Sequence, residues 1–174
     1  NLTQGDHILF PYSGGLDSFA ASRLLKRNAS RQPFYITIET SSQSRSVARK
    51  TIPQTQQMHA VIPIKFKKND HPEASSRTRT FMFFAVTALA ARMIRASGIL
   101  VAENGQGSIG PSLVPCGSEH PYVGTHPAFT RRFAQFIETL WPEHAIRFEH
   151  PYVWITKAEL LLALKESGLS SDWD

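Results

Sequence analysis

The chain contains very little cysteine. Only Cys116 is present among its 174 residues, so the chain can form no internal disulfide and no cysteine-rich zinc site of its own. This scarcity agrees with a reducing, cytoplasmic setting. No signal peptide is visible at the N-terminus. The most apolar segment, residues 81–94, is shorter than the roughly 20 residues that span a bilayer. The sequence therefore predicts a cytoplasmic protein without membrane association.

Acidic residues are fewer than basic ones. Asp and Glu number 14 against 19 Lys and Arg, which gives a net charge of +5. This balance suits a polyanion such as ATP, and it would also suit RNA or simply an ordinary solvated surface. No run of basic residues alternates with aromatic ones, as a groove for single-stranded nucleic acid would require. The length suits one domain, residues 1–174.

The most specific motif is Ser-Gly-Gly-Leu-Asp-Ser. It follows an apolar run at residues 7–10 and opens an apolar pattern of helical spacing, which predicts a strand, a tight turn and a helix start. Glycines allow positive φ and close approach of an anion, and a helix N-terminus favours phosphate. No lysine follows the glycines, which excludes the Gly-Lys-Ser/Thr nucleotide loop. An ordinary turn with Asp17 or Ser18 as N-cap is the alternative. The candidate anion-binding residues are Ser13, Gly14, Gly15, Leu16, Asp17 and Ser18.

The order of the other elements predicts an α/β fold. Strand patterns at residues 34–39, 60–66, 99–102 and 146–149 alternate with helical patterns that begin near residues 81, 127 and 156. This order indicates a doubly wound, mainly parallel sheet with helices on both faces. The helix at 81–96 is apolar around most of its circumference, so both of its sides should be packed, and Gly98 should be its C-cap. In the helix after Pro127, the expected buried residues are Phe129, Phe133, Phe136, Ile137 and Leu140.

Two further groups of residues are candidates for the site. Arg77 and Arg79 come just before the helix at 81–96, where guanidinium groups can bind phosphate or simply lie at the surface. Glu103 and Asn104 follow the buried strand at 99–102, at the edge where doubly wound sheets bind ligands. Glu103 could hold Mg²⁺, act as a base or bind an amine, and either residue could instead cap the next turn.

The last two helices begin with polar residues. Thr125 and His126 precede Pro127, and they could contact an anion or the acyl substrate, although capping alone explains them almost as well. Thr156-Lys157-Ala158-Glu159 reads as a capping box. Lys157 lies in the first turn of that helix and opposes its dipole, which indicates an anion nearby.

The Ser13–Ser18 motif resembles the signature of the PP-loop ATP pyrophosphatases. That resemblance implies that the loop holds the pyrophosphate of ATP while the α-phosphorus is attacked, which yields an adenylated intermediate and free pyrophosphate. The order of features resembles the QueC-like (7-cyano-7-deazaguanine synthase-like) branch. The segments at 103–105 and 124–127 are most similar to divergent QueC-like proteins of anti-phage defence operons.

Two departures from that branch concern the substrate and zinc. The family's zinc-binding cysteine cluster follows the Thr-Lys-Ala-Glu helix, but the sequence ends at Asp174 without it. We therefore expect the zinc segment to be absent or truncated, with Zn²⁺ bound only if such a segment exists. The family's arginine-asparagine pair is replaced by Arg77-Thr78-Arg79-Thr80. The acceptor therefore need not be the carboxy-deazaguanine that the synthase uses.

Together these features predict an ATP-dependent, ligase-like enzyme that forms AMP and pyrophosphate. The loop would bind ATP, Asp17 could orient Mg²⁺, and Arg77 or Arg79 would stabilise charge on the phosphates. Glu103 would act with Asn104, Thr125 and His126 toward a carboxylate or carbonyl acceptor, with a 7-deazaguanine-type molecule as one candidate. The rival interpretations are a tRNA-modifying PP-loop enzyme and a non-catalytic nucleotide-binding module of a defence complex. Expected partners include defence-operon proteins and a second copy of the chain.

Overall fold

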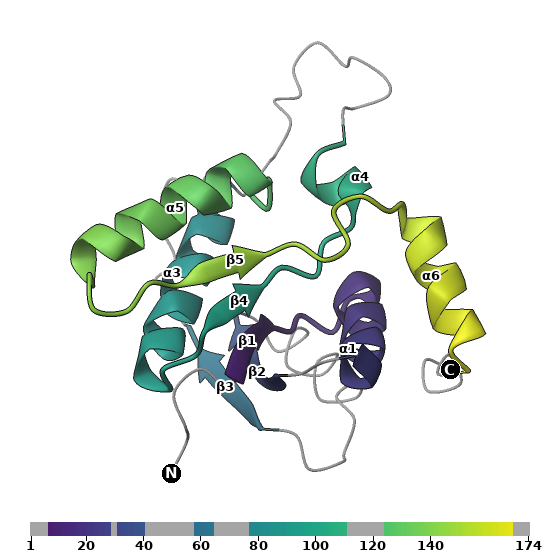
Figure 1. The fold of residues 1–174 in the computed structure, drawn as a ribbon, viewed down its shortest axis with the longest axis horizontal. Helices are drawn as coiled ribbons and strands as arrows, with labels where there is room; N and C mark the ends of the chain where they lie inside the picture. The colour runs from purple at the N-terminus through teal and green to yellow at the C-terminus, as the bar shows by residue number, and fades with distance from the viewer. Residues whose placement is uncertain (1–6, 29–30, 41–57, 65–76, 111–123, 169–174) are drawn as a thin grey trace.

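The computed structural model describes residues 7–28, 31–40, 58–64, 77–110 and 124–168 (Figure 1). Five strands form one sheet: β1 (His7–Pro11), β2 (Gln32–Glu39), β3 (His59–Pro63), β4 (Gly98–Leu100) and β5 (Arg147–Glu149). The helices are α1 (Leu16–Asn28), α3 (Arg77–Met93), the single turn α4 (Gly105–Ser108), α5 (Pro127–Leu140) and α6 (Lys157–Glu166). None of the described helices is long and apolar enough to cross a membrane.

The sheet is entirely parallel, with the strand order β3-β2-β1-β4-β5. Phe10 of β1 pairs with Tyr35 of β2, and Tyr35 pairs in turn with His59 of β3. The chain therefore builds outward from β1 to β3 and then returns to place β4 on the other side of β1. This reversal creates a switch point between β1 and β4, where parallel α/β sheets bind ligands beyond the carboxyl ends of the strands. The predicted doubly wound α/β fold is confirmed.

Helices cover both faces of the sheet because the central strands bury side chains on both faces. On one face, Ile8, Phe10 and Tyr35 pack under α1, which in turn packs against α6 through Phe19 and Leu160 (Figure 1). On the other face, α3 and α5 cover the sheet. The buried residues of that second core are Leu9, Ile36, Phe84, Ala88, Ala91, Ala96, Ile99, Val101, Phe133, Ile137 and Ile146.

The end of α3 differs from the expectation. The helix stops at Met93, and Arg95 takes the left-handed conformation at φ 53°. The amide of Ala96 then donates to the Ala91 carbonyl at 2.9 Å, which closes the helix. Gly98 is not the cap but the first residue of β4. A Cβ at Gly98 would lie 2.9 Å from the Arg147 carbonyl oxygen, so glycine is needed there for close strand packing.

Several apolar side chains that were expected to be buried are exposed. On α3, Leu89 and Met93 are 51% and 85% exposed, so the outer side of this helix is not packed in the described structure. On α5, Phe136 and Leu140 are 48% and 52% exposed, whereas Phe133 and Ile137 are buried as predicted. The apolar pattern identifies both helices correctly but overstates how much of each is covered.

Candidate active site

The Ser-Gly-Gly-Leu-Asp-Ser motif forms the turn between β1 and α1. The amide of Tyr12 donates to the Ile36 carbonyl at 2.8 Å, and the Thr37 hydroxyl donates to the Tyr12 carbonyl at 2.8 Å. These bonds attach the start of the turn to β2. Gly14 has φ 77°, in the region that glycine adopts at no steric cost. Leu16 then starts α1, and the N–H groups of its first turn have no partner within the helix.

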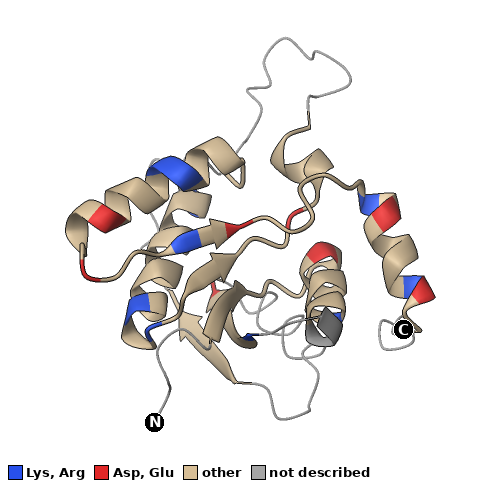
Figure 2. Ribbon diagram, viewed as in Figure 1, with Lys and Arg blue, Asp and Glu red and all other residues tan. Residues whose placement is uncertain are grey.

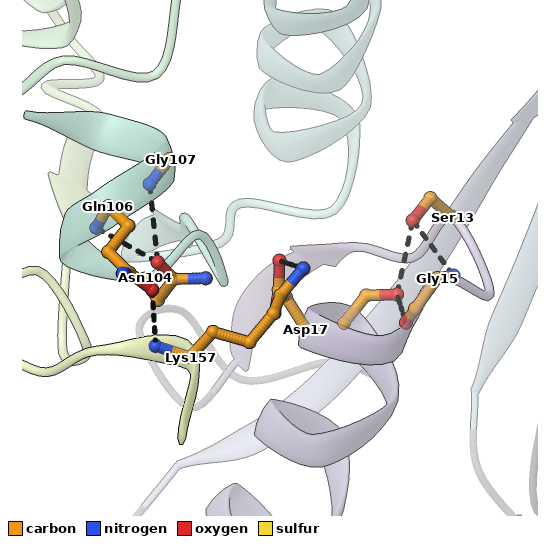
Figure 3. Close-up of polar contacts among 8 residues, drawn as sticks. Ser13, Gly15, Asp17, Asn104, Gln106, Gly107 and Lys157 are labelled. Atoms are coloured by element: carbon orange, nitrogen blue, oxygen red, sulfur yellow. Dashed lines mark hydrogen bonds and ion pairs between the residues drawn. The ribbon is translucent and has the colours of Figure 1, made fainter. Parts of the chain in front are cut away.

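The hydroxyl groups of the turn bond to the turn itself. Ser18 is buried, and its hydroxyl donates to the Gly15 carbonyl at 2.8 Å. The Ser13 hydroxyl lies 3.1 Å from that of Ser18 and accepts from the Gly15 amide at 3.2 Å (Figure 3). Ser13 is exposed, so an anion could take its place at the Gly15 amide without disturbing a buried side chain.

A cleft of about 400 Å³ opens in front of this turn. It lies between the carboxyl ends of β1 and β4, at the switch point of the sheet, with the start of α3 as one wall. The turn is therefore not filled by its own side chains, and an anion has room beside it. The residues that line the cleft are Pro11, Ser13, Gly15, Leu16, Asp17, Ser18, Thr80, Phe83, Phe84, Leu100, Val101, Ala102, Glu103, Thr125 and Lys157.

Two carboxylates and one ammonium group meet in the cleft. Lys157 Nζ lies 3.4 Å from Asp17 Oδ2 (Figure 3), and the Asp17 side chain is only 16% exposed. Burial raises the pKa of Glu103 above its ordinary value of 4.5, and the nearby negative charge of Asp17 raises this pKa further. The pKa increases because removing the last proton would place two negative charges close together in a partly buried site.

The backbone around Glu103 is held by its neighbours. Asn104 is buried, and its side-chain oxygen accepts from the amides of Gln106 and Gly107 at the start of α4. Gln106 Oε1 accepts from the Lys157 amide at 3.0 Å, which joins α4 to the start of α6. A Cβ at Gly107 would overlap the Glu103 carboxylate, so glycine at this position leaves space for that side chain.

Two helix starts frame the rest of the site. Thr156 and Glu159 form the predicted capping box of α6, which positions Lys157 at its first residue. His126 caps α5, because its Nδ1 accepts from the Ala128 amide at 3.0 Å. Thr125, directly before this cap, lines the cleft.

A second histidine supports the start of α5. His150 follows β5, and its Nε2 lies 2.8 Å from the hydroxyl of Thr130, a residue that is 1% exposed. Burial lowers the pKa of His150, and the neighbouring His126 lowers it further. His150 is therefore neutral at physiological pH, and it connects the end of β5 to the helix that carries His126.

An apolar hollow of about 80 Å³ lies beside the cleft. It shares Pro11, Ser13 and Phe83 with the cleft, and Ile36 and Ile38 of β2 contribute to its wall. The sixth lining residue, Tyr12, is buried. The hollow therefore continues the cleft from the glycine turn toward β2.

The two predicted arginines lie in the first turn of α3 rather than before it. The guanidinium of Arg79 lies 5.1 Å from the centre of the Phe83 ring, and this exposed side chain does not line the cleft. The side chain of Arg77 lies outside the described residues. So do Cys116 and all residues after Gly168, on which the zinc prediction depends.

The structure brings most of the predicted site together but not all of it. Seven predicted residues line the cleft: Ser13, Gly15, Leu16, Asp17, Ser18, Glu103 and Thr125. Gly14 is buried and does not line it. Asn104 and His126 are used as helix caps and do not line it. Lys157, Thr80 and Phe83 line the cleft but were missing from the predicted site residues. The unfavourable position of Lys157 in a first helical turn was the signal that could have identified it.

Comparison with known proteins identifies the fold. No protein-family model and no curated protein sequence matches the chain. The U34-tRNA thiolase NcsA from Methanococcus maripaludis is similar in structure, with a TM-score of 0.64 and 11% identity over 97% of this chain. The NH3-dependent NAD synthetase from Campylobacter jejuni is similar with a TM-score of 0.61 and 13% identity over 98% of it. The chain has the adenine nucleotide alpha hydrolase-like fold. It spans 58% of the thiolase chain and 67% of the synthetase chain.

Proposed function

We propose that the chain is a PP-loop enzyme that binds ATP in the cleft and transfers its adenylyl group to an acceptor, releasing pyrophosphate. The observation that carries this proposal is the Ser13–Ser18 turn, in which Gly14 has φ 77° and Gly15 and the N-terminus of α1 line a 400 Å³ cleft at the switch point. Free helix amides and the positive end of the helix dipole bind phosphate without any basic side chain.

The pyrophosphate of ATP fits the loop end of the cleft. The amides of the first turn of α1 and of Gly15 would donate to phosphate oxygens after Ser13 turns away. The Lys157 ammonium, 3.4 Å from Asp17, would be shared between that carboxylate and the phosphates. Arg77 and Arg79 precede Thr80 at the cleft wall and remain candidates for contact with the outer phosphate.

The two carboxylates suit Mg²⁺. No group of three or more His, Cys, Asp or Glu in the described ranges could hold a metal by itself. Mg²⁺, however, commonly takes only one or two carboxylates and completes its coordination with phosphate oxygens and water. Asp17 Oδ1 is buried without a hydrogen-bond partner among the described residues, and Glu103 lies beside it. Asp17 and Glu103 would hold the ion, which when bound neutralises charge on the phosphates.

The apolar hollow suits one end of the adenine ring, the rest of which would lie in the adjoining cleft. Phe83, Ile36 and Ile38 offer it apolar contacts, and the hollow shares Ser13 with the phosphate end of the cleft. With adenine in the hollow and pyrophosphate at the loop, the α-phosphorus would lie between the two. Thr125 and Glu103 would then face an acceptor that enters the open side of the cleft, with His126 and Asn104 directly behind them.

The proposed chemistry has two steps. An oxygen of the acceptor carboxylate bonds to the α-phosphorus of ATP, and the bond from that phosphorus to the bridging oxygen breaks, which releases pyrophosphate. An amine then adds to the acyl carbon and loses a proton, while AMP leaves with the electrons of the acyl–oxygen bond. The protein's part is to position the reactants and stabilise the charge that develops on the phosphates. A 7-deazaguanine carboxylate is a candidate acceptor.

The test is the identity of the phosphorus product. The protein is incubated with Mg²⁺, γ-labelled ATP and a set of carboxylates that includes 7-carboxy-7-deazaguanine, with hydroxylamine present to trap the acyl adenylate. We expect labelled pyrophosphate, AMP and a hydroxamate, with loss of all three in Asp17→Asn. Glu166→Gln, an exposed change at the end of α6, is the control and should behave like wild type. Orthophosphate and ADP as the only products would exclude the mechanism.

A tRNA acceptor is the second candidate. Similarity in fold to a U34-tRNA thiolase and the net charge of +5 support it. Pyrophosphate release that depends on added tRNA and falls steeply with salt would indicate that the acceptor is tRNA rather than a small carboxylate. Tight ATP binding without turnover under every condition would instead indicate a non-catalytic nucleotide-binding module of a larger complex, such as a defence complex.

A further inference from the structure

The outer edge of β5 has no partner strand in the described part of the chain. β5 is the last strand of the sheet and pairs with β4 on one side only. The Val101 amide donates to the Glu149 carbonyl at 2.8 Å, so the polar backbone groups of Glu149 point toward β4. Because these groups alternate along a strand, the N–H and C=O of Phe148 point outward from the sheet. An open edge of this kind can accept another strand.

A groove of about 500 Å³ runs between this edge and the outer side of α5. Arg131, Ala134 and Glu138 line it from α5, and Arg147 and Phe148 line it from β5. Arg131, Glu138 and Arg147 are exposed, and none of the three has an ion-pair partner among the described residues. The groove is therefore bordered by unpaired charges of both signs, next to unpaired backbone groups.

The charges are arranged so that the surface complements itself. Along both α5 and β5 a basic residue comes before an acidic one (Figure 2). If a second copy of β5 pairs antiparallel about a two-fold axis through Phe148, Arg147 of each copy lies directly opposite Glu149 of the other. Opposite charges in directly opposed positions stabilise antiparallel pairs. Glu149 already holds Arg31 through two hydrogen bonds of 2.8 and 2.7 Å, so the new contact would extend an existing ion pair.

The same two-fold axis would also bring the α5 helices of the two copies together. The contact between Thr130 and His150 fixes the register between helix and strand. From Thr130 to Ala134 the helix advances about 6 Å, and from His150 back to Phe148 the strand covers about 6.6 Å. These nearly equal distances place Ala134 beside Phe148. Helices that cross antiparallel about a point next to Ala134 place Arg131 of one copy opposite Glu138 of the other. Alanine at the centre allows the helices to approach closely.

We propose that the chain forms a two-fold symmetric homodimer through β5 and the outer side of α5, which makes one continuous ten-stranded sheet from two five-stranded sheets. This dimer is independent of the proposed enzymatic function, because neither Arg131 nor Glu138 lines the cleft.

Charge reversal tests the proposal. Arg131→Glu places like charges opposite Glu138 twice per dimer, and Glu138→Arg does the same with the opposite sign. We expect each single variant to weaken dimerisation more than about tenfold, measured by sedimentation velocity over a protein concentration series. The double variant Arg131→Glu/Glu138→Arg restores complementarity, so its dissociation constant should return to near the wild-type value. Arg132→Glu is the matched control, because this neighbour is exposed but does not line the groove.

The outcomes are distinct. Wild type that sediments at the monomer mass of 19.5 kDa throughout the series would overturn the proposal. A dimer that Arg131→Glu weakens no more than Arg132→Glu does would show that the copies meet elsewhere. Single variants that dissociate without rescue in the double variant would also contradict the pairing of Arg131 with Glu138. Circular dichroism of each variant confirms that it is folded.

Discussion

Asp17, Glu103 and Lys157 carry an unbalanced charge in a partly buried cleft. Two carboxylates face one ammonium group, and burial together with the nearby charge of Asp17 raises the pKa of Glu103. Two carboxylates close together are unfavourable for the empty protein, and a bound cation would reduce their repulsion beyond what Lys157 already provides. This arrangement is typical of residues selected for ligand binding rather than for stability.

Removing the charge of Glu103 should therefore increase the stability of the protein and decrease its activity. The folded protein holds the Glu103 proton more tightly than the unfolded chain does, so folded protein binds more protons at this site. The contribution of Glu103 to the free energy of unfolding consequently falls as the pH rises from 4.5 through the raised pKa. We expect Glu103→Gln to raise the melting temperature at neutral pH and to lower pyrophosphate release by more than about tenfold. A destabilised variant with full activity would contradict both the charge argument and the Mg²⁺ assignment. Differential scanning fluorimetry and the pyrophosphate assay provide the two measurements.

Lys157 should act on nucleotide affinity. Its ammonium group is half exposed beside Asp17, so we expect Lys157→Met to weaken binding of a non-hydrolysable ATP analogue by about tenfold, equivalent to one charge-assisted hydrogen bond. Lys165→Met, in the last turn of the same helix, makes the same chemical change away from the cleft. Equal affinities for the two variants in isothermal titration calorimetry would remove Lys157 from the site.

At the scale of elements, His126 caps α5 and is also a proposed contact of the acceptor, and mutation can separate the two. His126→Ala removes the cap of α5 and should cost about 1 kcal/mol of unfolding free energy, because the Ala128 amide loses its partner. His126→Asn retains a capping oxygen and should recover most of that loss in urea denaturation. If His126 also contacts the acceptor, the asparagine variant stays low in activity although it is stable. Full activity of His126→Asn would assign the residue to capping alone.

The sequence predicts local elements well because their signals are local. The glycine turn, the capping box at Thr156 and the proline-led start of α5 are each encoded within a few residues, and all three appear where expected. The parallel strands were also recognisable, since a buried parallel strand is a short continuous apolar run. The carboxyl ends of these strands then placed Glu103 and the loop at one edge of the sheet.

Features that depend on neighbours distant in the sequence were missed or misplaced. The left-handed cap at Arg95 could not be anticipated, because arginine carries no preference for that conformation and Gly98 lies only three residues later. Apolar spacing likewise cannot distinguish Phe133, which packs on the sheet, from the exposed Phe136. The position of Lys157 in a first helical turn indicates an anion nearby, but only the packing of α6 against α1 brings this residue to the cleft.

For the whole molecule, the switch point makes the proposed nucleotide site part of the folded core. The loop rests on β1 and β2, its helix packs against α6, and the facing carboxylate follows β4. A ligand that contacts all of these elements binds the folded chain and not the unfolded one, so it must stabilise the fold. Saturating Mg²⁺ and ATP should therefore raise the melting temperature, and this increase is a measure of site integrity that does not require knowledge of the acceptor.

Two glycines allow a controlled test of this coupling. Gly14 and Gly168 both have positive φ, 77° and 73°, but only Gly14 lies in the loop, whereas Gly168 follows α6 in open space. Alanine at either position should cost about 1–2 kcal/mol from the backbone alone. With ligand at about 100 times its dissociation constant, wild type and Gly168→Ala should gain about 2.7 kcal/mol, roughly 5–10 °C in melting temperature. Gly14→Ala should lose most of this gain, since its strained turn no longer presents amides to the phosphates. An equal ligand-induced shift in both variants would mean that ATP binds away from the Ser13–Ser18 loop.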